Sequence, residues 1–171
     1  MSDEVPGRLE AIRMLREDRA RTSASIERLS AAAFETTGLG GGAWSPKDLV
    51  GHLETWERFA IEAIEAIERG EPAPIAQESL ETDELNRREV ERQAARTAAE
   101  IRSSASATHD RVLQTFAALD DERWVAPEAP GTDRTVADRL GSILGGSLGS
   151  FRHDPDHWDD IEAFVAEHAS G

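Results

Sequence analysis

Two residue types are missing from this chain of 171 residues, and each absence removes a class of chemistry. Cysteine is absent, which excludes disulfides, thiolate metal ligands and a cysteine nucleophile, and leaves the redox compartment open. Tyrosine is absent as well, so one common catalytic acid is missing. No apolar run approaches the length that spans a membrane, so we expect no insertion into membranes.

Positive charge is also scarce. Lys47 is the only lysine, the arginines are scattered among acidic residues, and the formal net charge is −15. Such a surface repels phosphate backbones, which argues against nucleic acid as a partner. The N-terminal stretch MSDEVPGRLE lacks the basic and apolar regions of a signal peptide, so we expect a cytoplasmic protein.

What is present is helical periodicity. Hydrophobic residues make up 39% and charged residues 31%, which is typical of a soluble globular chain. Apolar residues recur at helical spacing over residues 6–29, 46–70, 82–119 and from 135 onward. We find no strand alternation or second-domain boundary, so we predict a single all-α domain over residues 1–171. The predicted fold is a four-helix bundle with long inter-helix loops, which frame a site or include crossover connections.

The first predicted helix has a polar middle, where Arg19, Thr22 and Ser23 interrupt the apolar stripe. Two interpretations stay open: a loosely packed turn, or the polar wall of a pocket. If Arg19 faces inward, its guanidinium could bind an anionic group of a substrate.

The second predicted helix has a clear start and an unusual inner face. Ser45 is a good N-cap and Pro46 suits the first helical position. His52 follows Leu49 by three residues and precedes Trp56 by four, so the three share the buried face. A lone histidine there is either a hydrogen-bonded core residue or a metal ligand.

The fourth predicted helix begins after Thr135 and continues towards paired histidines. On a helical wheel, small residues that include Gly146 and Gly149 fall on the same side as His153 and His157. Either the glycines allow close helix packing, or they leave space beside the imidazoles that a substrate fills.

The stretch FRHDPDHWDD places His153 and His157 four residues apart with Pro155 between them. On an unbroken helix such residues share a face, but proline breaks helix interiors. Asp154 could instead cap a new helix that starts at Pro155. With His52, the pair would give three nitrogen ligands, which suit zinc, nickel or iron and leave positions open for water or substrate.

Other polar residues are candidates for supporting roles. Glu57, Asp156 and Asp160 could accept the second N–H of a ligating histidine, although exposed helix acids are commoner. His109 and His168 are expected to be ordinary solvated or partly buried residues.

Taken together, these segments resemble the DinB-like superfamily. The stretch WSPKDLVGHLETWER is similar to its second-helix signature, and HDPDHWDDIEAF is similar to its C-terminal segment with two histidines four apart. TDELNRREVERQ and LDDERW look like the middle segments, so the resemblance covers roughly residues 8–164. Within the superfamily, the chain most resembles ClbS/DfsB-type bundles and the N-terminal domains of mycothiol-dependent maleylpyruvate isomerases.

The resemblance implies a four-helix bundle, often a homodimer, that holds a divalent metal through His52, His153 and His157. It also implies a small-molecule enzyme, either a hydrolase or a transferase or isomerase that uses a low-molecular-weight thiol. Trp56, Gly146, Gly149 and Arg19 would then line the substrate site. Pro155 departs from the family pattern and favours the alternative, a metal-free, non-catalytic bundle that binds other molecules.

Overall fold

The computed structural model describes residues 5–169, and within that range it confirms an all-α fold. The α-helices are α1 (Arg8–Ile26), α2 (Ala31–Phe34), α3 (Pro46–Glu68), α4 (Thr82–Gln93), α5 (Ala98–Ala118), α6 (Asp121–Val125), α7 (Val136–Ile143) and α8 (Trp158–His168). Three short 3₁₀ helices accompany them: η1 (Leu39–Gly41), η2 (Pro74–Gln77) and η3 (Asp154–His157). Among the described residues, no helix combines the length and apolar character that crossing a membrane requires.

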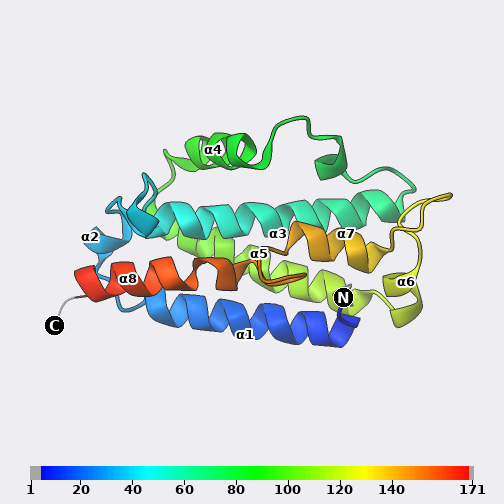
Figure 1. Cartoon of the computed structure of the whole chain (residues 1–171), viewed down its shortest axis with the longest axis horizontal. Coiled ribbons are helices and arrows are strands. Elements are labelled where there is room, and N and C mark those ends of the chain that lie inside the picture. Colours follow the sequence, from blue (N-terminus) through cyan, green and yellow to red (C-terminus); the bar gives the residue numbers. More distant parts are fainter. Residues whose placement is uncertain (1–4, 170–171) are drawn as a thin grey trace.

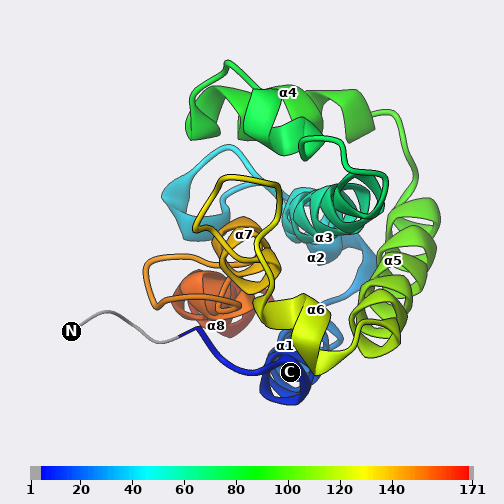
Figure 2. The same ribbon diagram turned by 90° about the vertical axis from the view of Figure 1, so that its right-hand side faces the viewer.

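The long helices α1, α3 and α5 form three of the positions of a four-helix bundle (Figure 1). The shorter helices α7 and α8 share the fourth position. Seen from the end, α3 packs against α5 and α7, while α1 packs against α5 and α8 (Figure 2). Helix α4 lies outside this arrangement, along the outer side of α3 (Figure 2).

Helix α3 begins where the sequence predicts, because a complete capping box fixes its first turn. The Ser45 hydroxyl accepts a hydrogen bond from Asp48 N at 3.2 Å, and the Asp48 carboxylate accepts one from Ser45 N at 2.8 Å. Pro46 occupies the first turn, where no backbone N–H is needed. The Ser45 cap, seven residues before His52, fixes the point at which α3 begins.

We predict that Ser45→Ala lowers the free energy of unfolding by about 1 kcal/mol, because the cap hydrogen bond is lost. Denaturant titration followed by circular dichroism measures this change. Ser103→Ala, at an exposed position within α5, is the matched control and should leave stability unchanged. Equal stability of both variants would show that this cap contributes little.

The predicted continuous helix over residues 82–119 is wrong, because a second capping box starts a new helix. Thr97 accepts from Glu100 N at 3.2 Å, and the Glu100 carboxylate accepts from Thr97 N at 2.8 Å. The chain turns there, so α4 rests on the outside of α3 while α5 enters the bundle. The first helix is also shorter than predicted, since it ends at Ile26 and Ser30 caps the separate α2.

The predicted fourth helix is wrong beyond Ile143. Glycines at 145, 146 and 149 disfavour helix, and Gly146 and Gly149 instead exchange two backbone hydrogen bonds of 3.1 Å across a tight turn. Phe151 then adopts a positive φ of 60°. The helical-wheel strip that joined these glycines to the histidines therefore does not exist.

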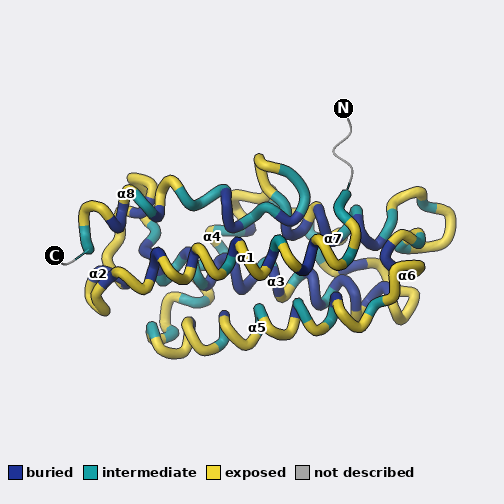
Figure 3. Tube along the Cα trace, turned by 90° about the horizontal axis from the view of Figure 1, so that it is seen from below, coloured by how far each residue is buried: buried dark blue, intermediate teal, exposed yellow. Residues whose placement is uncertain are grey.

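Two hydrophobic clusters fill the bundle, and polar residues lie between them. One cluster includes Leu15, Phe116 and Trp124, and the other includes Leu49 and Phe164. The polar residues between these clusters, which we call the polar layer, come from α1, α3, α5 and the segment before α8. Its members are Arg19, His52, Glu57, His109, His153, Asp154 and His157. Figure 3 shows buried positions alternating with exposed turns along α1 and α3.

Candidate metal centre

Three histidines from distant parts of the chain meet in the polar layer. One ring nitrogen from each of His52, His153 and His157 lies within 4.8 Å of the others. The Nε2 atoms of His52 and His153 are 2.9 Å apart. His52 is only 5% exposed, and the other two rings are half-buried. The structure thus brings together the three residues that the sequence suggested.

The bend at Pro155 does not separate the paired histidines. Pro155 occupies the first turn of η3, where its missing N–H costs nothing, and Asp156 N donates to His153 O at 3.2 Å. Because η3 is a tight helical turn, the ring centroids of His153 and His157 remain 5.2 Å apart. Asp154 does not cap this turn as the sequence suggested, since no side-chain cap bond forms there.

The protonation state of the cluster fits a cation. Burial lowers the pKa of all three rings, and the neighbouring histidines lower the pKa values of His52 and His153 further. The pKa of His153 falls to about 4. Neutral imidazoles at pH 7 present lone pairs, which is the form that binds metals.

The geometry of the cluster fits a cation as well. Nε2 of His157 is buried and has no hydrogen-bond partner among residues 5–169, so an acceptor lone pair or an N–H is left unsatisfied. Nitrogens that share a tetrahedral zinc lie about 3.3 Å apart, which follows from Zn–N bonds of roughly 2.0–2.1 Å. The ring nitrogens of the cluster lie within 4.8 Å of one another, so binding a zinc ion would require the more widely separated ones to move closer together.

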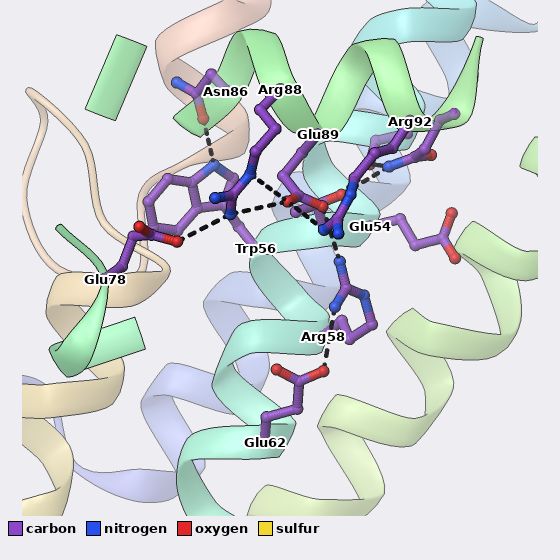
Figure 4. Close-up of polar contacts among 12 residues, drawn as sticks. Glu54, Trp56, Arg58, Glu62, Glu78, Asn86, Arg88, Glu89 and Arg92 are labelled. Atoms are coloured by element: carbon purple, nitrogen blue, oxygen red, sulfur yellow. Dashed lines mark hydrogen bonds and ion pairs between the residues drawn. The ribbon is translucent and has the colours of Figure 1, made fainter. Parts of the chain in front are cut away.

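Two tryptophans flank the cluster. The Trp44 ring centroid lies 5.0 Å from that of His52, and the Trp56 centroid lies 6.0 Å from that of His153. Trp56 Nε1 donates to Asn86 Oδ1 of α4 at 3.0 Å, which fixes its ring (Figure 4). The sequence pointed to Trp56 but not to Trp44, although Trp44 directly precedes the Ser45 cap.

Helix α4 is anchored over Trp56 by a buried carboxylate. Glu89 is 6% exposed, and its oxygens lie 3.4 Å from Arg58, 3.1 Å from Arg88 and 3.0 Å from Arg92 (Figure 4). Arg88 and Arg92 belong to α4 itself, so the ion pair between Arg58 and Glu89 is the one of these three that joins α4 to α3 and helps keep Asn86 in position above the tryptophan.

An ionic chain runs beside the histidines. The Arg19 guanidinium binds Asp154 at 2.9 Å and Glu57 at 3.1 Å, and Glu57 accepts from Nδ1 of His109 at 2.7 Å. Burial would raise the pKa of Asp154, but the Arg19 charge and hydrogen bond hold it below its usual value. Arg19 faces inward, which is the condition under which the sequence predicts an anion-binding role for it, but two carboxylates of the chain already occupy its guanidinium.

The three carboxylates proposed as hydrogen-bond partners of the ligands have other contacts. Glu57 forms an ion pair with Arg19 and accepts a hydrogen bond from His109, as described above. Asp156 accepts from the backbone N of Ser147 at 2.7 Å and from its hydroxyl at 2.8 Å. Asp160 packs against Gly40, where an added Cβ would lie 2.7 Å from Oδ2. No hydrogen bond joins any of these carboxylates to the three clustered rings in the described part of the chain.

The glycines predicted to line a substrate site are placed by the turn before η3. A Cβ at Gly146 would lie 1.8 Å from Oδ2 of Asp156, so this glycine permits close packing. Gly149 has a φ of 108°, which favours glycine, and it lines a shallow cavity of about 350 Å³ together with Gly146. None of the three clustered histidines lines that cavity. A role for these glycines in substrate binding stays a prediction.

The remaining two histidines differ from each other. His168 stacks on Phe164 at a centroid distance of 4.0 Å and donates from Nδ1 to the Phe164 carbonyl, which is an ordinary helix-end contact. His109 is partly buried, as the sequence suggested, but its contact with the buried Glu57 was not foreseen.

Comparison with known proteins identifies a family. A family model described as the DinB superfamily matches residues 14–145. The match includes α3 with His52 and ends before His153 and His157. Neither the curated proteins nor the solved structures yielded a match.

Proposed function

Because this chain belongs to the DinB superfamily, we propose that it is a divalent-metal-dependent enzyme that acts on a small molecule. The observation that carries the proposal is the convergence of His52, His153 and His157, whose ring nitrogens lie within 4.8 Å of one another. The same cluster leaves His157 Nε2 buried without a hydrogen-bond partner among the described residues. A three-histidine set suits zinc, nickel or iron.

The chain's own residues would hold and enclose this centre. When bound, a divalent cation supplies Lewis acidity that activates water or a thiol and polarises a substrate carbonyl. Trp44 lies beside the imidazole of His52 and Trp56 beside that of His153, where they would form an apolar border of the centre. Arg19 holds Asp154, and through it the backbone beside His153.

The finer assignment rests on the resemblance to ClbS/DfsB-type bundles and to the N-terminal domains of mycothiol-dependent maleylpyruvate isomerases. We propose either a hydrolase or a transferase or isomerase that uses a low-molecular-weight thiol, acting on an electrophilic substrate as a cytoplasmic homodimer. Trp56 would line the substrate site, because its ring borders the cluster.

Metal analysis and activity assays test this proposal. Protein purified without a histidine tag should contain about one equivalent of zinc, nickel or iron per chain, as expected for a site with three protein ligands. A panel of electrophilic esters, amides and epoxides, with and without small thiols, should show turnover that chelation abolishes and metal restores. Absence of metal after reconstitution would overturn the proposal.

One observation favours the alternative of a metal-free binding protein. The Nε2 atoms of His52 and His153 are close enough to share a hydrogen bond, so these two rings can satisfy each other without a cation. Under this alternative, reconstitution gives no bound metal and the protein has no metal-dependent turnover.

We predict that metal also stabilises the fold. A ligand that binds only the folded state at 1,000 times its Kd adds about 4 kcal/mol to the free energy of unfolding. Thermal denaturation of chelator-treated protein, with and without added zinc, measures the shift in Tm. Magnesium prefers oxygen ligands and is the control cation. Equal Tm values with zinc and magnesium would contradict a nitrogen-ligated site.

A further inference from the structure

A second cavity lies between α1, α3 and α5, apart from the histidine cluster. Its volume is about 650 Å³, which is in the range of small-molecule sites. None of the three clustered histidines lines it. The three helices that enclose it are seen from their ends in Figure 2, and α1 and α5 are seen side by side in Figure 3.

The cavity has an apolar floor and polar groups at its middle. Leu53, Ile26 and Ala105 contribute apolar surface from the three helices. His109 lines the cavity, and Glu57 holds its Nδ1 at 2.7 Å. An ionised carboxylate only accepts hydrogen bonds, so Nδ1 is the donor and Nε2 is left for another partner. Ser106 adds a hydroxyl one helical turn away. These groups suit a ligand whose middle carries both donors and acceptors, as a peptide bond does.

The rim of the cavity carries charges of both signs. Arg16, Glu27, Arg102 and Asp110 line it and are exposed. Within residues 5–169, none of these four side chains forms an ion pair within 4.0 Å, whereas most arginines of the chain do. Because both signs are present, the ammonium and the carboxylate of one ligand can each find an opposite charge at this rim.

The length of the cavity sets the size of the ligand. On α1 the lining runs from Arg16 to Glu27, which corresponds to about 16 Å along a helix. An extended tripeptide spans roughly 10 Å, and its side chains and terminal groups add to this length. Helices α1 and α5 run antiparallel, so Glu27 and Arg102 lie towards one end of the cavity and Arg16 and Asp110 towards the other.

From these features we propose that the cavity between α1, α3 and α5 binds a zwitterionic molecule of dipeptide or tripeptide size. The charged termini lie at the two ends of the rim, the apolar side chains contact the floor, and the central amide groups bond with His109 and Ser106. The site is distinct from the proposed metal centre, since none of the three clustered histidines lines it. Arg19 is shared, because it lines the cavity and also holds Asp154 beside His153.

The test uses the tripeptide Ala-Leu-Ala with free termini, titrated into the full-length protein and followed by two-dimensional NMR. Saturable shifts should appear in residues of α1 and α5. The same peptide with an acetylated N-terminus and an amidated C-terminus lacks both charges and should bind at least about tenfold more weakly, which corresponds to 1.4 kcal/mol. If binding is not saturated at about 10 mM peptide, the Kd is too high for a specific site and the proposal is overturned. Equal binding of the two peptides would overturn it as well.

Variants on α1 identify the cavity as the site. Ala20 is exposed and lines the cavity, so Ala20→Phe fills it without displacing core residues. Ala24 is equally exposed on α1 but does not line the cavity, so Ala24→Phe is the matched control. We expect Ala20→Phe to lower peptide affinity at least tenfold, and Ala24→Phe to leave it within twofold, since a tenfold change is well above experimental error. Unchanged affinity in Ala20→Phe would overturn the assignment.

Failure at this site and failure at the metal centre are distinguishable. Ser106→Phe fills the cavity from α5 and repeats the test from the opposite wall. Both cavity variants should retain the metal content of the parent protein, while His52→Ala should retain peptide binding. Peptide-induced shifts confined to Trp44, Trp56 and the clustered histidines would place the peptide at the metal centre and contradict the proposal.

Discussion

His52→Ala should lower the affinity for zinc by more than 100-fold, and it should reduce the metal content of the purified protein to near zero. Loss of a residue that merely orients a ligand already costs about 10–100-fold in affinity, so loss of a ligand should cost more. His52 contributes from α3, while the other two rings come from the segment around η3. Without His52, the remaining pair would have to hold the cation alone. Competition with a fluorescent zinc chelator measures the affinity.

The control for this experiment is His168→Ala. His168 lies in the last turn of α8, stacked on Phe164, outside the cluster. Its removal tests whether any histidine of this acidic chain contributes to metal content. If both variants lost metal equally, or if His52→Ala kept its full complement, the three-histidine site would be wrong. His153→Ala and His157→Ala should behave like His52→Ala.

Arg19→Ala should lower the free energy of unfolding by about 3–5 kcal/mol, because removal of one partner from a buried ion pair leaves uncompensated charge. The side chains of Arg19, Glu57 and Asp154 are 12%, 2% and 9% exposed, so water does little to replace the guanidinium. Chemical denaturation measures the change. The same variant should weaken metal binding, since Asp154 directly precedes Pro155 and follows His153.

Two further variants define the origin of this effect. Arg16→Ala removes an exposed arginine of the same helix and should change stability by no more than about 0.5 kcal/mol. Replacing Glu57 with Gln and Asp154 with Asn in the Arg19→Ala background removes the unpaired charges and should restore part of the loss. No restoration would mean that lost packing of the Arg19 stem, rather than unpaired charge, causes the instability.

Local signals in the sequence were sufficient for some elements. The start of α3 was predictable because Ser45, Pro46 and Asp48 form a complete start signal within four residues. A similar signal, Thr97 with Glu100, marks the start of α5, but the apolar stripe on both sides of it suggested one helix. The glycines before η3 were read as one helical face, although they form a turn.

Contacts between distant residues were harder to predict. His52 and His153 stand out because histidine is rare in the chain, so their meeting could be anticipated. Arg19 and Asp154 are 135 residues apart, and each is one of many charged residues, so nothing in the sequence singles out this pair. The contact of His109 with Glu57 depends on how α5 is rotated against α3, which periodicity alone does not determine.

The position of the polar layer between two separate hydrophobic clusters affects how the sequence of this molecule can change. Each end of the bundle has its own core, so loops and core residues there can be exchanged without moving the layer. Helices α1 and α3 each continue without interruption from one cluster to the other, so both are poorly able to accept insertions. Sequence divergence or protein engineering should therefore succeed most readily at the two ends, and the middle turns of α1 and α3 should tolerate the fewest changes.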